Sequence, residues 1–197
     1  MRQGDSRILT LPNVISVVRL CCIPLFLWLL FSKKDREGGA VLLAGIGTTD
    51  WIDGYIARRF DQGSTLGKII DPVADRLLLG VGVVALMVDG AVPWWFGSLA
   101  LLREALVSVG VVGLASLGAR RIDVTWVGKC ATFGLMTTFP LFLASKASFS
   151  WHDFARAMAW IIGIPSVALS YYAAVGYLPI AKQALSEGRT GRAARKG

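Results

Sequence analysis

Four aspartates lie in two closely spaced pairs within an apolar part of this chain. Asp50 and Asp53 are three residues apart, and Asp71 and Asp75 are four apart, so on helices each pair projects from one face. An ionised aspartate at the centre of a membrane helix costs at least ~2.5 kcal/mol on insertion scales, and such residues mark functional sites. Four converging carboxylates repel one another unless cations neutralise them, and all-oxygen ligands suit magnesium, manganese or calcium. The spacing therefore predicts a divalent-cation site built from two helices.

The residues between the two pairs indicate what the cations would bind. Gly54 directly follows the first pair and Gly67 precedes the second, and both leave room for a substrate to approach a helix. Arg58 is placed to meet phosphate oxygens. Magnesium usually binds through a few carboxylates together with substrate phosphates. This combination suggests a nucleotide diphosphate held through metal, while a histidine-based metal site is excluded because His152 is the sole histidine.

The positioning elements are predicted to be membrane helices. The chain has 197 residues, 54% of them hydrophobic and only 17% charged, which is too apolar for an ordinary soluble domain. We expect an all-α polytopic membrane protein whose six helices form one bundle. Each span needs about 20 residues of helix. The expected spans are residues 12–31, 40–59, 68–88, 93–116, 127–146 and 155–181.

No linker interrupts these spans, so residues 1–186 are predicted to form a single membrane domain. Residues 1–11 are expected to form a short interfacial segment before the first span. Residues 187–197 are small and basic, and are predicted to be a disordered tail.

The distribution of basic residues predicts the orientation in the membrane. Thirteen lysines and arginines fall on the side that holds both termini, and four fall on the other side. Because basic residues accumulate in short cytoplasmic loops, both termini and the acid pairs are expected to face the cytoplasm, in the cytoplasmic membrane. The formal charge of +8 is explained by anionic lipid of the inner leaflet rather than by nucleic acid, since no interleaving of aromatic and basic residues occurs outside the spans.

The acid-rich segment also resembles a known signature. The string Asp50-x2-Asp53-Gly54-x2-Ala57-Arg58-x8-Gly67-x3-Asp71-x3-Asp75 is similar, at every fixed position, to that of the CDP-alcohol phosphatidyltransferase family of phospholipid synthases. Eight defined residues at fixed spacing make this a specific motif.

The resemblance implies a six-helix fold, commonly a homodimer, with an active site open to the cytosolic leaflet. It implies that one or two divalent ions, Mg²⁺ or Mn²⁺, are held by Asp50, Asp53, Asp71 and Asp75. It also implies a CDP-diacylglycerol site formed by Asp50, Asp53, Gly54, Ala57, Arg58, Gly67 and Asp71. Asp75 would act as the general base that takes the proton from the acceptor hydroxyl, which attacks phosphorus and expels CMP.

Further segments are similar to the phosphatidylglycerophosphate synthase branch of this family, namely LPNVISVVRL, TDWIDGYIARR, DPVADRLLL, LLREALVS and VGKCATF. The acceptor in that branch is glycerol 3-phosphate, a dianion that needs cations beyond Arg58. The candidates are Arg103, Arg120, Arg121 and Lys129. Arg120 and Arg121 are equally explained as topological charges, Arg103 as the partner of Glu104, and Lys129 as a side chain reaching the interface.

Other functions stay open at this point. The segment DVTWVGK departs from the usual glycerophosphate-type pattern, which keeps a cardiolipin synthase using phosphatidylglycerol as the alternative. Inositol phosphate and serine are less expected acceptors, given the LPN opening and the REAL segment. A divalent-cation transporter is the alternative from another class, although cation conduction does not require Ala57, Arg58 and Gly67. A catalytically silent scaffold is not expected, because all eight signature positions are filled.

Overall fold

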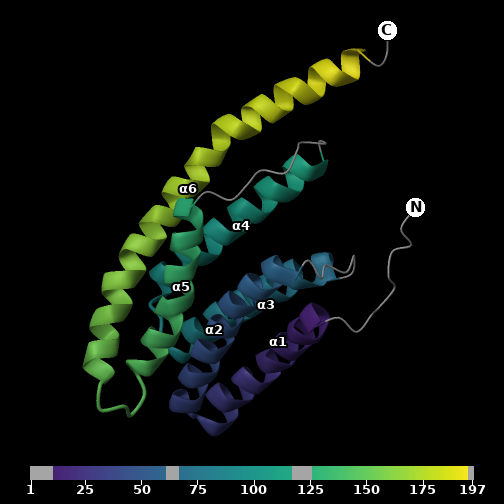
Figure 1. Ribbon diagram of the computed structural model, residues 1–197. Helices are drawn as coiled ribbons and strands as arrows, with labels where there is room; N and C mark the ends of the chain where they lie inside the picture. Colours follow the sequence, from purple (N-terminus) through teal and green to yellow (C-terminus); the bar gives the residue numbers. More distant parts are fainter. Residues whose placement is uncertain (1–10, 61–66, 117–125, 195–197) are drawn as a thin grey trace. The chain divides into compact units, whose positions relative to one another are not determined.

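The computed structural model is helical throughout the part of the chain that it describes, without strands there, as predicted. It describes the backbone of residues 11–60, 67–116 and 126–194, and the side chains of residues 17–49, 76–110 and 126–176. The elements are α1 (Leu11–Leu27), the π-helical η1 (Trp28–Lys33), α2 (Arg36–Phe60), α3 (Gly67–Asp89), α4 (Trp94–Ser116), α5 (Trp126–Ala144) and α6 (His152–Ala194) (Figure 1).

The first residues of the α-helices lie close to the first residues of the predicted spans. Each of the six α-helices begins within four residues of a predicted span. The C-terminal end differs, because α6 continues to Ala194 and so covers most of the segment from Glu187 that was expected to be disordered. Alanine, arginine and glutamate in this segment are good helix formers, and extending an existing helix is easier than starting one. The expected interfacial segment lies outside the described residues except for Leu11, which begins α1.

Two helices in the described part of the chain are long and apolar enough to cross a membrane, namely Trp126–Ala144 and His152–Gly176. Large apolar side chains are also exposed on other helices, including Val41, Val88 and Val109. Extensive exposed apolar surface indicates contact with a membrane or another protein. These features fit a membrane protein, and the crossing of the membrane by all six helices stays a prediction.

The chain divides into two compact units. The first comprises residues 1–94 and 136–159, and the second comprises residues 95–135 and 160–197. The signature segment, residues 50–75, therefore belongs to the first unit, together with α1, α2, α3 and the C-terminal half of α5.

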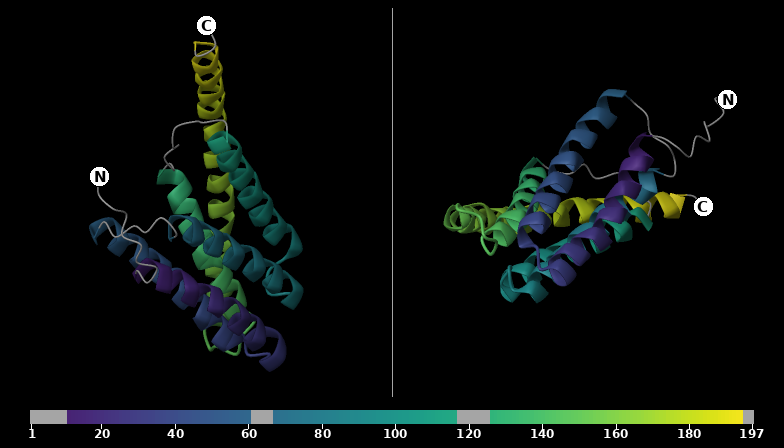
Figure 2. Two further views of the ribbon diagram at one scale, coloured as in Figure 1. Left: turned by 90° about the vertical axis from the view of Figure 1, so that its right-hand side faces the viewer. Right: turned by 90° about the horizontal axis from the view of Figure 1, so that it is seen from below.

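In the first unit, α1 packs against both α2 and α3 (Figure 1, Figure 2). The core includes Phe26 of α1, Leu86 of α3 and Leu143 of α5, which are almost completely buried. Gly39 lets α2 approach closely, because a Cβ atom there would lie 3.2 Å from Leu143 and 3.5 Å from Phe26. Small residues at such contacts allow membrane helices to pack tightly.

Local turns fix the ends of α2 and α3 that lie far from the signature. Lys34 adopts a left-handed conformation with φ of 53°, and the carboxylate of Asp35 accepts a hydrogen bond from the Gly38 amide at 2.8 Å, which caps α2. At the end of α3, Gly90 has φ of 78° and the Ala91 amide donates to the Leu86 carbonyl at 3.0 Å.

The second unit is held by aromatic and small-residue contacts among its helices. Trp95 of α4 stacks on Trp160 of α6 with ring centroids 5.6 Å apart. The Tyr171 hydroxyl donates to the Leu99 carbonyl at 2.9 Å. Gly134 of α5 lies so close to α6 that an added Cβ atom would overlap the Ser166 hydroxyl.

Candidate active site

All eight signature residues lie on the two helices of the α2–α3 hairpin. Asp50, Asp53, Gly54, Ala57 and Arg58 are on the C-terminal half of α2. Gly67 is the first residue of α3, and Asp71 and Asp75 follow in its first three turns. Both acid pairs therefore have the helical backbone that their spacing requires. Their side chains lie outside the described residues, so the metal and nucleotide contacts predicted for them remain predictions.

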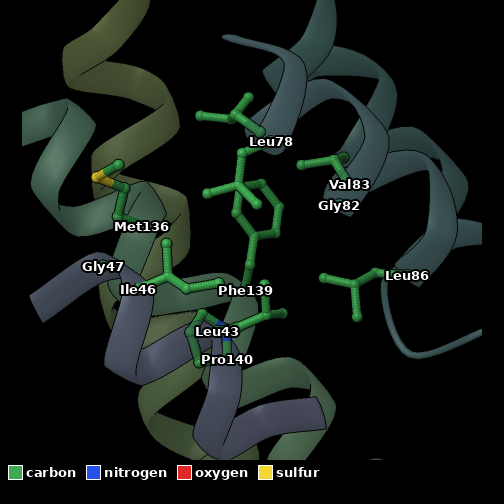
Figure 3. A pocket seen from close by; sticks show the side chains of 11 residues that line it. Leu43, Ile46, Gly47, Leu78, Gly82, Val83, Leu86, Met136, Phe139 and Pro140 are labelled. Atoms are coloured by element: carbon green, nitrogen blue, oxygen red, sulfur yellow. The ribbon is translucent and has the colours of Figure 1, made fainter. Parts of the chain in front are cut away.

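A small apolar cavity of about 50 Å³ lies where α2, α3 and α5 meet in the first unit. Side chains from the three helices converge on it, with Leu43 and Ile46 from α2, Leu86 from α3 and Phe139 from α5 (Figure 3). The full lining is Leu43, Ile46, Gly47, Leu78, Leu79, Gly82, Val83, Leu86, Met136, Phe139 and Pro140. The cavity shows which faces of α2 and α3 are directed toward the space between them.

The aspartates of the signature lie on the same faces of α2 and α3 as the residues that line the cavity. Asp50 follows Gly47 by three residues on α2, and Asp75 precedes Leu78 by three residues on α3. Residues three apart on a helix share a face. Asp50 and Asp75 thus occupy positions on the two faces that border the cavity, and the other member of each pair lies one turn further along.

A larger groove of about 500 Å³ runs between α2 and α5 in the same unit. Its lining extends from Phe149 and Trp151, beyond the end of α5, to Thr48 on α2, two residues before Asp50. The other lining residues are Ala40, Val41, Ala44, Gly45, Gly47, Met136, Thr137, Pro140, Leu141 and Ala144.

The groove is apolar in character. The Thr48 hydroxyl donates to the Ala44 carbonyl of its own helix at 2.8 Å, so its proton is already engaged. At the far end, the rings of Phe149 and Trp151 stack with centroids 5.0 Å apart. An occupant of this groove would be recognised by apolar contact and shape.

Of the two predicted acceptor-binding residues whose side chains the structure describes, Arg103 is the more deeply buried. It lies on α4 with 6% of its surface exposed, and its Nη1 donates to the Glu104 carboxylate at 2.9 Å. Its Nε atom is buried without a hydrogen-bond partner. A guanidinium carries five N–H donors, and an unpaired donor away from water is costly. Arg103 therefore retains capacity to bind an oxygen-rich group.

The other predicted cations have less support. Lys129 is on α5, and its ammonium lies 5.4 Å from the centroid of the Trp126 ring in an exposed position. This cation–π contact is a structural explanation for Lys129, in addition to a side chain that reaches the interface. Arg120 and Arg121 lie outside the described residues.

Among the side chains that the structure describes, no group of three or more histidine, cysteine or acidic residues is placed to hold a metal. The predicted ligands, Asp50, Asp53, Asp71 and Asp75, are not among those side chains. Their donor chemistry nevertheless fits a hard divalent cation, because each supplies carboxylate oxygens from one of two neighbouring helices.

One ion pair of the first unit joins two residues that no sequence pattern connects. Arg36, the first residue of α2, binds both carboxylate oxygens of Asp89, the last residue of α3, with nitrogen–oxygen distances of 3.1–3.3 Å. The two residues are 53 positions apart, so no local spacing rule could have paired them.

Comparison with known proteins agrees with the signature. The model of the CDP-alcohol phosphatidyltransferase family matches residues 9–172. A putative cardiolipin synthase of Mycobacterium tuberculosis is 39% identical over 79% of this chain and 75% of its own length. The CMP-forming cardiolipin synthase of Streptomyces coelicolor is 38% identical over 90% of this chain and 85% of its own length. A probable phosphatidylglycerophosphate synthase of M. tuberculosis is 33% identical over 71% of this chain and 68% of its own length.

The family model covers both helices that carry the signature and most of the remaining chain. Members of this family are membrane-associated, generally depend on a divalent metal, and transfer a group from a CDP-alcohol to an alcohol acceptor. The protein is therefore a phosphatidyltransferase of phospholipid biosynthesis, and it belongs to the CDP-alcohol phosphatidyltransferase family.

Proposed function

We propose that this enzyme transfers the phosphatidyl group of CDP-diacylglycerol to the hydroxyl of a glycerol-type acceptor and releases CMP. The observation that carries the proposal is the placement of Asp50 and Asp75 on the faces of α2 and α3 that border one shared cavity. Carboxylates at these positions on two helices can bind a divalent cation that in turn binds the diphosphate of the substrate. The transporter and the silent scaffold have no support from the comparisons.

In this proposal, Asp50, Asp53, Asp71 and Asp75 bind one or two Mg²⁺ or Mn²⁺ ions. Bound divalent ions would offset the charge that develops on the departing cytidylate. Gly54, Ala57, Arg58 and Gly67 would complete the CDP-diacylglycerol site with Asp50, Asp53 and Asp71. Asp75 would take the proton from the acceptor hydroxyl as that oxygen attacks the phosphorus next to diacylglycerol.

The apolar groove between α2 and α5 supports a lipid substrate. It opens at Thr48, half a turn of helix before Asp50, and extends about 12 Å along α2 to Ala40. An acyl chain attached to a phosphorus near Asp50 would therefore enter an apolar channel immediately. The stacked rings of Phe149 and Trp151 would lie at the far end of that chain.

Two acceptors have specific support. The LPNVISVVRL and LLREALVS segments favour glycerol 3-phosphate. Similar proteins are named probable phosphatidylglycerophosphate synthase, at 33% identity, and CDP-diacylglycerol–glycerol-3-phosphate 3-phosphatidyltransferase, at 28% identity. The relatives named cardiolipin synthase share more of the sequence, at 38% and 39% identity. We therefore place phosphatidylglycerol first and glycerol 3-phosphate second. Arg103 would bind the phosphate that both acceptors carry, through the part of its guanidinium that does not contact Glu104.

An assay of the purified enzyme with CDP-diacylglycerol, Mn²⁺ and each acceptor separately would identify the acceptor that it uses. CMP release should be accompanied by cardiolipin when phosphatidylglycerol is supplied. Phosphatidylglycerophosphate from glycerol 3-phosphate, with no cardiolipin in the parallel reaction, would reverse the order of the two acceptors. CMP release with neither acceptor above an Asp75→Asn control would refute the proposed function.

The assembly and topology are also part of the proposal. The enzyme is expected to be a homodimer in the cytoplasmic membrane, with both termini and the active site facing the cytoplasm. The asymmetric distribution of basic residues along the sequence supports this orientation. Labelling of single-cysteine variants in intact cells would test it.

A further inference from the structure

The ion pair between Arg36 and Asp89 joins the two acid-bearing helices at the ends opposite the signature. Arg36 Nε lies 3.1 Å from Asp89 Oδ2 and 3.3 Å from Oδ1, and Nη2 lies 3.2 Å from Oδ1. Asp89 is only 10% exposed and Arg36 is 41% exposed. A bidentate, partly buried pair is more specific in geometry than an exposed lysine pair.

The Arg36–Asp89 ion pair is separated from the signature aspartates by the same number of residues on both helices. Arg36 precedes Asp50 by 14 residues on α2, and Asp89 follows Asp75 by 14 residues on α3. At a rise of 1.5 Å per residue, each separation is about 21 Å. The two helices are consecutive in the chain, connected at the signature end and bridged by the ion pair at the other end. Because the same number of residues separates the ion pair from Asp50 on α2 and from Asp75 on α3, the two aspartates lie at the same distance from the ion pair along the hairpin.

The signs of the two charges indicate that their mutual contact explains their presence. Arg36 is at the N-terminus of α2 and Asp89 is at the C-terminus of α3. The helix dipole favours acids at N-termini and bases at C-termini, so each of these residues is disfavoured by the dipole of its own helix. The first turn of α2 is already capped by Asp35. Neither residue therefore serves its own helix end.

We propose that Arg36 and Asp89 are positioning residues that set the register of α2 against α3 and thereby align the carboxylates for divalent-metal binding. This inference rests on the proposed function, because the aligned groups are its metal ligands. A slip of one helical turn along either helix would displace one acid pair by about 5.4 Å relative to the other. Such a displacement is too large for a shared cation whose ligand distances are near 2 Å.

The test measures Mn²⁺ binding to the purified, substrate-free enzyme by the loss of the free-ion electron paramagnetic resonance signal. Arg36→Gln and Asp89→Asn should each weaken Mn²⁺ binding about three- to fivefold, the upper range for the loss of a partly exposed ion pair. The double variant should bind no more weakly than either single variant, because both changes break one contact. The reversed pair, Arg36→Asp with Asp89→Arg, should restore binding, and the helix dipoles favour the reversed arrangement.

The matched control is Arg156→Gln, which removes an exposed ion pair with Asp153 in the same unit. It should leave Mn²⁺ binding unchanged.

The proposal is overturned if either single variant binds Mn²⁺ within twofold of wild type, if the single effects multiply in the double variant, or if Mn²⁺ binding stays impaired in a folded reversed pair. The conservative amide variants decide the question should the reversed pair fail to fold. Failure of wild type to bind Mn²⁺ would refute the metal site of the proposed function and this inference with it, whereas equal binding by wild type and variants refutes this inference alone.

Discussion

Arg103 donates a hydrogen bond to its sequence neighbour Glu104 at 2.9 Å, while its own Nε atom remains buried and unpaired. A purely structural pair would satisfy the guanidinium more fully, because a buried donor without a partner costs about 1–3 kcal/mol. Glu104 therefore holds Arg103 in place and leaves part of its hydrogen-bonding capacity open. This relationship makes Arg103 the strongest candidate in the described part of the chain for binding the acceptor phosphate.

Replacing Arg103 by glutamine should mainly raise the KM for the acceptor. A hydrogen bond to a charged group contributes about 1.5–3 kcal/mol, which corresponds to a loss of roughly 10- to 100-fold in kcat/KM for the acceptor. The KM for CDP-diacylglycerol should change little. Arg156→Gln is the control, since Arg156 is an exposed arginine whose partner is Asp153. Equal losses for both substrates would indicate a structural role for Arg103 instead.

Asp75→Asn should abolish turnover while the enzyme still binds CDP-diacylglycerol. An asparagine keeps the size of the side chain but cannot take the proton of the acceptor hydroxyl, and general-base catalysis typically contributes about 10²–10⁴-fold. Single-turnover assays and equilibrium binding of labelled CDP-diacylglycerol would separate the two effects. Substantial synthesis by Asp75→Asn would rule out this residue as the base.

Chelation of divalent metal should remove activity reversibly. The predicted ligands are all carboxylates, so Mg²⁺ or Mn²⁺ should restore activity after treatment with EDTA, and Asp53→Asn should require a higher metal concentration. The measurement is the rate of CMP release against free metal concentration. Full activity in excess chelator would contradict the cation site.

Filling the α2–α5 groove should impair the use of long-chain substrates selectively. Ala44 lines the groove and is exposed, so Ala44→Phe can place a ring there without disrupting a buried contact. The kcat/KM should fall more for a CDP-diacylglycerol with long acyl chains than for one with short chains. Ala105→Phe on an exposed position of α4 is the matched control. A loss independent of chain length would argue against an acyl chain in the groove.

The helices and the signature were predictable because they depend on local patterns. Apolar stretches of about 20 residues predicted the starts of all six α-helices to within four residues. The spacings of three residues within the Asp50 pair and four within the Asp75 pair match one face of a helix, and both pairs lie on helices. The contact of Arg36 with Asp89 was not predictable, because it joins residues 53 positions apart after the helices have packed. The extension of α6 to Ala194 was missed because composition alone does not reveal that a polar segment continues a preceding helix.

The contact between Gly134 and Ser166 gives the clearest prediction for stability. A Cβ atom at Gly134 would overlap the Ser166 hydroxyl and touch Ile162, so Gly134→Ala forces α5 and α6 apart in the second unit. Overpacking of this kind costs about 1–3 kcal/mol, which should lower the midpoint of thermal unfolding in detergent. The double variant with Ser166→Gly should recover most of the loss, because the opposing side chain is then absent. Gly110→Ala is the control, since nothing lies within 4 Å of an added Cβ atom there. An equal shift for Gly134→Ala and Gly110→Ala would mean that helix propensity, and not the contact with α6, determines the effect.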